Sequence, residues 1–339
     1  MQSMTTPQMR PRVARTMPQS RPPLFGQTPP AVFPVIFGLL GLGLAWRRAS
    51  AAWGVPEALG ELLLGAFMLI WIFAASAYVG KLGRRPSVIL DDLRILPGRA
   101  GLATMTQGAM LVAAALVPHA PRMASIVLVA AVAGHALIAA LSAWALATGP
   151  KEQRHVTPVW HLTFVGFIVA PIAALPLGLV PLAQGCTIFA AIMAGIVYGV
   201  SIAQLAREAP PAPLRPLLAI HLAPMALFGL AAAGFGKPVV ALAFGVLALL
   251  VLGALLIRAR FLTVAGFSPF WGAFTFPFAA FANLMLALAV MDVPGAPGFG
   301  LIGLLALLAG SVMIPIIAVK VLQMWARGTL AARTNAARA

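Results

Sequence analysis

The sequence predicts an all-α membrane protein with ten transmembrane helices. Hydrophobic residues make up 61% of the 339 residues and charged residues only 9%, whereas soluble domains carry about 25% charged residues. No segment shows the recurring alternation of polar and apolar residues that a β-barrel requires. A helix needs about 20 mostly apolar residues to cross a bilayer, and ten stretches qualify. They run over residues 30–46, 57–82, 100–118, 122–148, 157–178, 179–206, 214–235, 238–259, 267–291 and 297–324.

The predicted membrane domain, residues 30–326, lies between two basic tails. Residues 1–29 are rich in Arg, Pro, Gln, Ser and Thr and contain no acidic residue, which predicts a disordered segment. They lack the apolar core of a secretory signal. Residues 327–339 form the second, shorter basic tail. Cys186 is the only cysteine, so the sequence allows neither an intrachain disulfide nor a cysteine-based metal site.

The basic residues are placed asymmetrically along the chain, which predicts its orientation. Net charge is +16, and with a cytoplasmic N-terminus all but four of the 23 Lys and Arg residues fall on the cytoplasmic side. The four exceptions are Arg47, Arg48, Arg122 and Lys237. This positive-inside bias predicts a bacterial inner-membrane protein with both termini in the cytoplasm. We therefore interpret the charge as orienting the chain and contacting anionic lipids, and we expect no nucleic-acid partner.

The ten predicted helices form five hairpins, which start near residues 30, 100, 157, 214 and 267. Prolines recur in the first helix of most hairpins: Pro34, Pro171, Pro224 and Pro277, with Gly108 in the middle of the third helix. A proline frees a backbone carbonyl, which in a membrane needs a partner or a wet cavity. Parallel repeats of this kind are related by an axis along the membrane normal. The pattern favours five broken odd-numbered helices around a central pore, although prolines are also common in membrane helices generally.

The ninth predicted helix carries one aromatic ring on an otherwise small and polar face. At about 3.6 residues per turn, Phe270, Phe274, Phe278 and Phe281 share one face. The opposite face carries Gly272, Phe276, Ala279 and Asn283. Small and polar faces of membrane helices contact protein or a cavity. We therefore expect Phe276 to project toward the interior as a plug, with Pro277 able to rotate this face.

Four segments on odd-numbered helices resemble the tellurite-resistance/dicarboxylate transporter family, which includes the slow anion channels of plant guard cells. They are FPVIFGLLGLGLAW at 33–46, TPVW at 157–160 followed by Val165 and Gly166, LRPLLAIHLAP at 214–224, and WGAFTFP at 271–277. Each motif is weak alone, but their order along the chain makes the resemblance fairly specific. One departure is Thr163, where many members have a proline, so the helix path and pore width near Thr163 are not predicted by the resemblance.

The resemblance implies five helical hairpins in a quasi-five-fold arrangement around a central pore, with odd helices inside and even helices outside. It implies a homotrimer in which each protomer has its own pore, and a pore closed by a phenylalanine that matches Phe276. The other residues that we expect to line the pore are Phe33, Gly38, Gly108, Thr163, Gly166, Pro171, Pro224, Gly272, Pro277 and Asn283.

The titratable residues within the predicted helices allow structural or functional interpretations. His135, His161 and His221 could relay protons or bind haem, but a hydrogen bond to a neighbouring helix explains each more simply. Glu57 and Glu61 at the start of the second helix favour a capping role. Asp91 and Asp92 lie among arginines, which predicts loop salt bridges. The sequence contains no nucleotide-binding loop, nucleophile elbow or zinc motif, so we expect neither an enzyme nor a cofactor or metal.

The middle of every odd-numbered helix lacks acidic residues, which disfavours cation transport. Basic residues are also missing there, so an anion would meet backbone dipoles and side chains such as Thr163 and Asn283. The sequence therefore predicts an anion channel or channel-like transporter for small anions: halide, nitrate, oxyanions such as sulfite or tellurite, and small carboxylates. Two alternatives stay open. One is a proton-coupled transporter of C4-dicarboxylates or monocarboxylates, and the other is a membrane haem or quinone protein.

Overall fold

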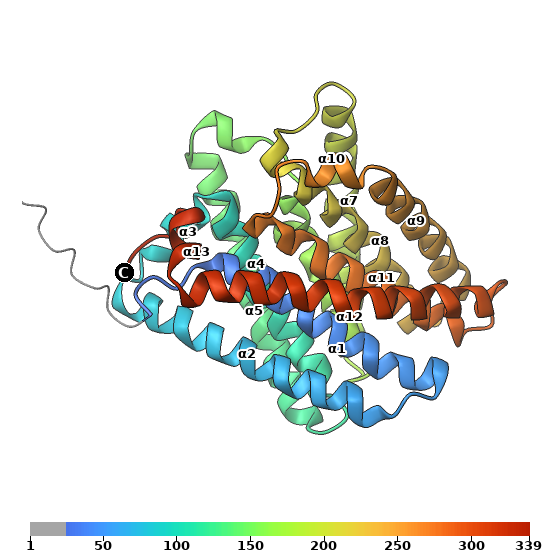
Figure 1. Cartoon of the computed structure of the whole chain (residues 1–339). Helices are drawn as coiled ribbons and strands as arrows, with labels where there is room; N and C mark the ends of the chain where they lie inside the picture. The colour runs from blue at the N-terminus through green and yellow to red at the C-terminus, as the bar shows by residue number, and fades with distance from the viewer. Residues whose placement is uncertain (1–24) are drawn as a thin grey trace, which may run out of the picture.

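The computed structural model describes residues 25–339, and every regular element in this part of the chain is helical (Figure 1). Of the tail predicted to be disordered, residues 1–29, residues 1–24 lie outside the described residues, whereas Thr28 is buried and hydrogen-bonded. The all-α prediction is therefore confirmed for residues 25–339. The α-helices are α1 Phe33–Trp53, α2 Glu57–Arg84, α3 Val88–Leu93, α4 Leu96–Leu116, α5 Pro121–Thr148, α6 Pro171–Ala174, α7 Val180–Leu205, α8 Leu222–Gly234, α9 Pro238–Ile257, α10 Ala259–Thr263, α11 Thr275–Ala289, α12 Ala296–Ala326 and α13 Thr329–Arg333.

Short 3-10 or π-helical segments precede several of these α-helices. Five are 3-10 helices and one, η3, is a π-helix. Their bounds are η1 Pro30–Val32, η2 Lys151–Arg154, η3 His161–Val165, η4 Gly166–Val169, η5 Ala212–His221 and η6 Pro269–Phe274.

Eight helical segments are long and apolar enough to cross a membrane, and they coincide with eight of the ten predicted spans. The other two are the third and fifth predicted spans. α4 has 21 residues but includes polar and small residues such as Arg99, Thr104 and Gln107. The fifth span is not one continuous helix, because residues 161–174 divide into η3, η4 and α6. The total of ten spans therefore stays a prediction.

Two classes of helix differ in how much of their surface is buried. In the segments containing α1, α8 and α11, 72 to 83% of the most apolar window is buried, against 17 to 39% in α2, α5, α7, α9 and α12. Each buried segment contacts the exposed helix that follows it in the chain, as α1 contacts α2 and α11 contacts α12. The buried segments also contact one another: α1 packs against α4 and α11, α8 against α11, and α6 against α4 and α8.

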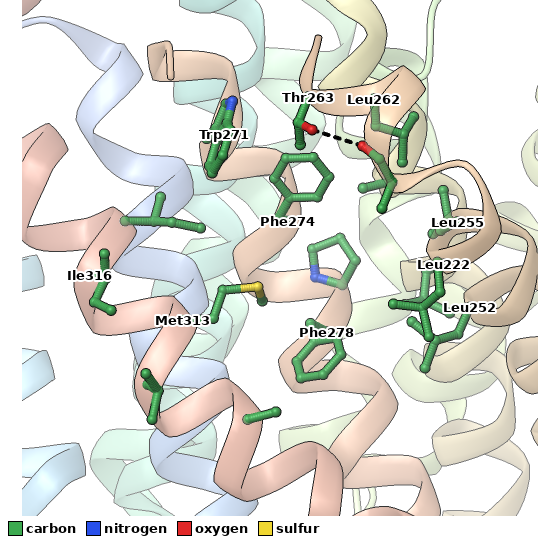
Figure 2. Close-up of a pocket in the computed structure, with 17 residues that line it drawn as sticks. Leu222, Leu252, Leu255, Leu262, Thr263, Trp271, Phe274, Phe278, Met313 and Ile316 are labelled. Atoms are coloured by element: carbon green, nitrogen blue, oxygen red, sulfur yellow. Dashed lines mark hydrogen bonds between the residues drawn. The ribbon is translucent and has the colours of Figure 1, made fainter. Parts of the chain in front are cut away.

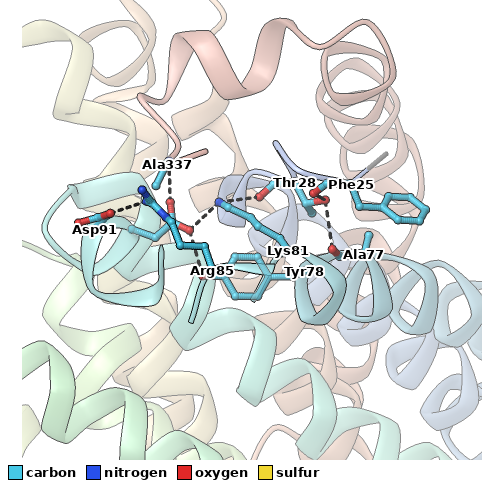
Figure 3. A network of polar contacts seen from close by, with 9 residues as sticks. Phe25, Thr28, Ala77, Tyr78, Lys81, Arg85, Asp91 and Ala337 are labelled. Carbon is cyan, nitrogen blue, oxygen red and sulfur yellow. Dashed lines mark hydrogen bonds and ion pairs between the residues drawn. The ribbon is translucent and has the colours of Figure 1, made fainter. Parts of the chain in front are cut away.

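The two described ends of the chain meet at one end of the molecule. There the backbone N–H of Ala339 donates to the carbonyl of Gly26 at 3.0 Å. Beside this contact, Lys81 of α2 forms a fully buried ion pair with Asp92 of α3 at 2.8 Å, and also donates to the Thr28 carbonyl (Figure 3). Asp92 further accepts hydrogen bonds from the hydroxyl of Tyr78 and the backbone N–H of Ala337. One buried carboxylate therefore joins α2, α3 and the C-terminal segment.

Candidate functional site

A cavity of about 330 Å³ opens among the buried helices. We call it the central cavity. Five consecutive inner parts of the chain contribute to its wall: α1, α4, α6 with the turn after it, α8 and α11. Its lining residues are Gly41, Leu44, Arg47, Arg48, Ala51, Leu111, Ala114, Val117, Pro118, Ile172, Pro176, Leu227, Leu230, Phe276, Ala280 and Asn283.

The Phe276 side chain forms part of the wall of the central cavity and stacks on Phe37 of α1. The two ring centroids are 3.6 Å apart with an angle of 21° between the planes. The side chains are 5% and 1% exposed, so both rings are packed on nearly all sides. Gly41 lies against the same ring, and a Cβ at this position would come within 2.9 Å of the Phe276 ring. The glycine therefore makes room for the stacked pair.

A second, much smaller cavity has a volume of about 30 Å³, and its lining residues on α1 and α4 come before those of the central cavity in the sequence. We call it the opposite cavity. On α1 its wall includes Pro34, whereas the central cavity begins at Gly41, so Phe37 lies between the two. On α4 the corresponding residues are Ala100 and Leu111. The remaining lining residues are Ala31, Pro97, Leu162, Leu217, Ile220, Pro269, Phe270 and Ala273.

Prolines set the local backbone around this site. Pro34, Pro171, Pro224 and Pro277 each fall within the first turn of α1, α6, α8 and α11, directly after a 3-10 segment. A proline lacks an N–H, but the first-turn N–H groups of an α-helix have no partner within that helix in any case. The prolines therefore mark the point where each inner segment changes from 3-10 to α geometry. The structure thus shows a change of helix geometry near each of these four prolines.

The opposite face of α11 contacts a separate apolar groove. Figure 2 shows Phe274 and Phe278 projecting into this groove, which has a volume of about 620 Å³ and is also lined by Met313 and Ile316 of α12. α9 and α10 supply its other side. Phe276 does not line the groove, since it faces α1. The structure therefore separates Phe274 and Phe276 onto two faces, as the sequence predicts.

The other predicted lining residues occupy several environments. Asn283 lines the central cavity, and its side-chain amide donates to the Gly41 carbonyl at 3.0 Å. Gly38 and Gly272 lie at the contact between α1 and the η6–α11 segment. Phe33 packs edge-on against Tyr78 of α2, and Gly108 lies against Trp71 of α2, so both face an outer helix.

The remaining predicted residues lie on the broken inner segments. Thr163 in η3 is buried, and Gly166 packs against Gln107 and His135. Pro171 and Pro224 are buried at the starts of α6 and α8. Pro277 is buried and also contributes to the apolar groove. Of the predicted set, Phe276 and Asn283 alone line the central cavity.

The sequence prediction missed two arginines of the central cavity. It ends the first span at residue 46 and assigns Arg47 and Arg48 to a loop, but α1 continues to Trp53 and ends at Gly54, whose φ of 66° is the left-handed value that glycine readily adopts. Arg47 forms a bidentate ion pair with the Glu61 carboxylate, with N–O distances of 2.6 and 2.8 Å. Glu61 therefore acts as an ion-pair partner as well as lying near the start of α2.

The three histidines of the predicted membrane helices bond to neighbouring segments. The Thr106 hydroxyl lies 2.7 Å from Nδ1 of His135. Nε2 of His161 lies 3.0 Å from Nδ1 of His221, which joins η3 to η5. This confirms the interpretation of each as a histidine bonded to a neighbouring helix. None of the three lines the central cavity or the opposite cavity.

The family model described as voltage-dependent anion channel (SLAC1) matches residues 27–322 of the chain. This match covers all the inner segments and nearly all of the described residues. The chain therefore belongs to the voltage-dependent anion channel family, whose members are channels and transporters, and is a multi-pass membrane protein. No curated protein sequence matches the chain.

Proposed function

We propose that the protein passes small anions through a pore along the axis of its five inner segments, and that the Phe276 ring closes this pore. The observation that carries the proposal is the position of the Phe37–Phe276 stack, which falls between the residues that line the two cavities along α1 and along the η6–α11 segment. A tightly packed aromatic pair leaves no path for a hydrated ion and offers no groups to replace its water. Removing one ring would join the cavities.

The wall of the central cavity favours anions over cations. Among its described lining residues are two arginines and Asn283, and no carboxylate. A single water needs about 10–15 Å³ of cavity measured with a water-sized probe, so about 330 Å³ holds an anion with much of its hydration shell. The proposed substrates are halide, nitrate, oxyanions such as sulfite or tellurite, and small carboxylates. Proton-coupled transport or haem binding would draw on the membrane histidines, and these lie away from both cavities.

The arrangement of the helices supports a ring. Pairwise contacts run from α1 to α4, α6, α8, α11 and back to α1, with the more exposed helices outside. We therefore propose ten spans in five hairpins with quasi-five-fold symmetry. The charge bias supports cytoplasmic termini, which a reporter fused after Ala339 tests. The homotrimer rests on resemblance alone, and the mass of the complex in mild detergent tests it.

The test of the pore proposal compares Phe276→Ala with Phe274→Ala in liposomes. Phe276→Ala removes the ring between the cavities, so chloride flux should rise strongly above that of the unmodified protein. Phe274→Ala removes a ring of the same size at the end of η6, on the side of the apolar groove, and should leave flux nearly unchanged. Truncating a packed phenylalanine typically costs about 3–5 kcal/mol of stability, so folded protein must be matched between samples.

Four outcomes separate the possibilities. Increased flux for Phe276→Ala alone supports the proposed pore. Increased flux for Phe274→Ala alone would place the pore on the groove side of α11. Flux that neither variant raises would contradict closure by an aromatic ring of this helix. Uphill anion uptake driven by a pH step alone would favour the proton-coupled alternative and direct attention to His161 and His221.

A further inference from the structure

Arg48 differs from its neighbour Arg47 in having no counter-ion among residues 25–339. Both side chains line the central cavity near the end of α1. The Nε of Arg48 is buried and has no hydrogen-bond partner within residues 25–339. A buried, unpartnered guanidinium N–H is costly, and native structures rarely leave one without a reason. The arginine therefore presents unused donors and a permanent charge at the wall of the central cavity.

Arg47 already has its charge and its donors occupied. Its Nε and one Nη bind the two Glu61 oxygens, and its Nη atoms also donate to the carbonyls of Ala114 and Ala115 at the end of α4, at 3.2 and 2.9 Å. His119 lies 2.9 Å from the same Glu61 carboxylate. Glu61 is thus engaged by two other groups, and it does not line the central cavity. It is not placed to neutralise Arg48.

The polar groups around Arg48 do not supply a substitute counter-ion. Asn283 is the only other polar side chain among the described lining residues besides Arg47, and its amide nitrogen donates to the carbonyls of Gly41 and Ala279. The rest of the wall is apolar or backbone. A cavity with low-dielectric walls focuses the field of a charge inside it, so an anion there is attracted far more strongly than at an open surface.

We propose that Arg48 is an anion-binding residue of the central cavity, which holds a small hydrated monovalent anion on the side of the Phe37–Phe276 stack away from the chain termini. Binding itself follows from the cavity and the unpaired guanidinium. Its effect on transport rests on the proposed function. Arg48 concentrates anions at the barrier, and the ion-paired Arg47 holds α1 against α2 and α4.

The binding test uses chloride as the probe and the closed, unmodified protein in detergent. Chloride exchange with a protein site broadens the ³⁵Cl NMR line, and nitrate should compete for the same site. Arg48→Gln removes the charge and shortens the side chain but keeps a polar amide with two N–H donors, so the broadening should be lost. Arg48→Lys should retain part of it. The matched control is Arg122→Gln, which removes a charge at the exposed start of α5, outside the central cavity, and should leave the broadening unchanged.

The transport test places the same substitutions in the Phe276→Ala background. Charge focusing in a cleft raises local ion concentration and encounter rates by about tenfold or more, so Arg48→Gln should lower conductance about tenfold at low chloride and much less at saturating chloride. Unchanged line broadening in Arg48→Gln would overturn the proposal whatever the flux results. If Phe276→Ala fails to conduct, the pore proposal fails, and the NMR comparison still decides whether Arg48 binds the anion.

Discussion

The inner and outer helices of this protein differ in a way opposite to that of a soluble bundle. The inner segments containing α1, α8 and α11 are mostly buried, yet glycine, proline and polar residues interrupt them. The outer helices α2, α5, α7, α9 and α12 are longer, more continuous and exposed over most of their surface. Lipid is as apolar as leucine, so an apolar face gains nothing from leaving it, and close packing has to come from small residues and hydrogen bonds.

This difference explains why the inner segments hold the chemistry. Small residues let α1 approach α11 closely enough that Thr275 donates to the Pro34 carbonyl at 3.2 Å and Phe276 stacks on Phe37. The outer helices contribute polar contacts at a few points only, such as Lys81 at the end of α2 and His135 in α5. The comparison predicts that a few strong polar contacts stabilise the position of an outer helix. An inner helix is stabilised by close packing along its whole length.

The largest stability effect should come from the strongest of these point contacts, the buried pair of Lys81 and Asp92. Both side chains are fully buried, and Asp92 also accepts hydrogen bonds from Tyr78 and Ala337. Removing one member of a buried pair leaves the other charge uncompensated, so Asp92→Asn should cost about 3–5 kcal/mol. Thermal unfolding in detergent measures this as a lowered midpoint.

The control is the neighbouring carboxylate, which forms an exposed pair. Asp91 contacts Arg85 at 2.5 Å, with the two side chains 41% and 44% exposed. Exposed pairs contribute about 0–1 kcal/mol, so Asp91→Asn should barely change the midpoint. Equal effects of the two substitutions would mean that the α2 end is not anchored through Asp92.

The sequence predicts the all-α membrane fold, and of the central cavity it predicts the α11 residues Phe276 and Asn283. The prolines of the odd-numbered helices mark the points where the inner segments change geometry, because a proline constrains the backbone wherever it occurs. Helical phase separates Phe276 at the start of α11 from Phe274 at the end of η6, because residues two positions apart on a helical path point to nearly opposite sides. Both features depend only on residues that are close together in the sequence, so they can be predicted from one segment alone.

Contacts between elements were the part that sequence reasoning could not supply. Phe37 lies far from Phe276 in the sequence, and neither helix taken alone predicts that these two rings stack on each other. Arg47 and Arg48 were assigned to a loop because adjacent charges usually end a membrane span. In the structure both lie within α1, where Glu61 binds Arg47 and both side chains line the central cavity. These contacts depend on tertiary structure.

The inner and outer helices should also differ in their tolerance of a single added methyl group. A Cβ on Gly101 of α4 would fall on the backbone carbonyl of Pro30 in η1, and a backbone atom cannot rotate out of the way. Overpacking of this kind typically costs about 1–3 kcal/mol, so Gly101→Ala should lower the unfolding midpoint clearly.

On the outer helices, a Cβ on Gly199 of α7 or Gly80 of α2 would meet no other atom within 4 Å. Alanine is favoured over glycine in a helix by about 1 kcal/mol, so both substitutions should be neutral or stabilising. Two outer sites are needed because a subunit contact could cover one of them. The three variants measured side by side in the same detergent give the comparison directly. Outer-helix substitutions as damaging as Gly101→Ala would show that the outer surface is itself closely packed against another chain, and the division into inner and outer helices would then describe the protomer but not the assembly.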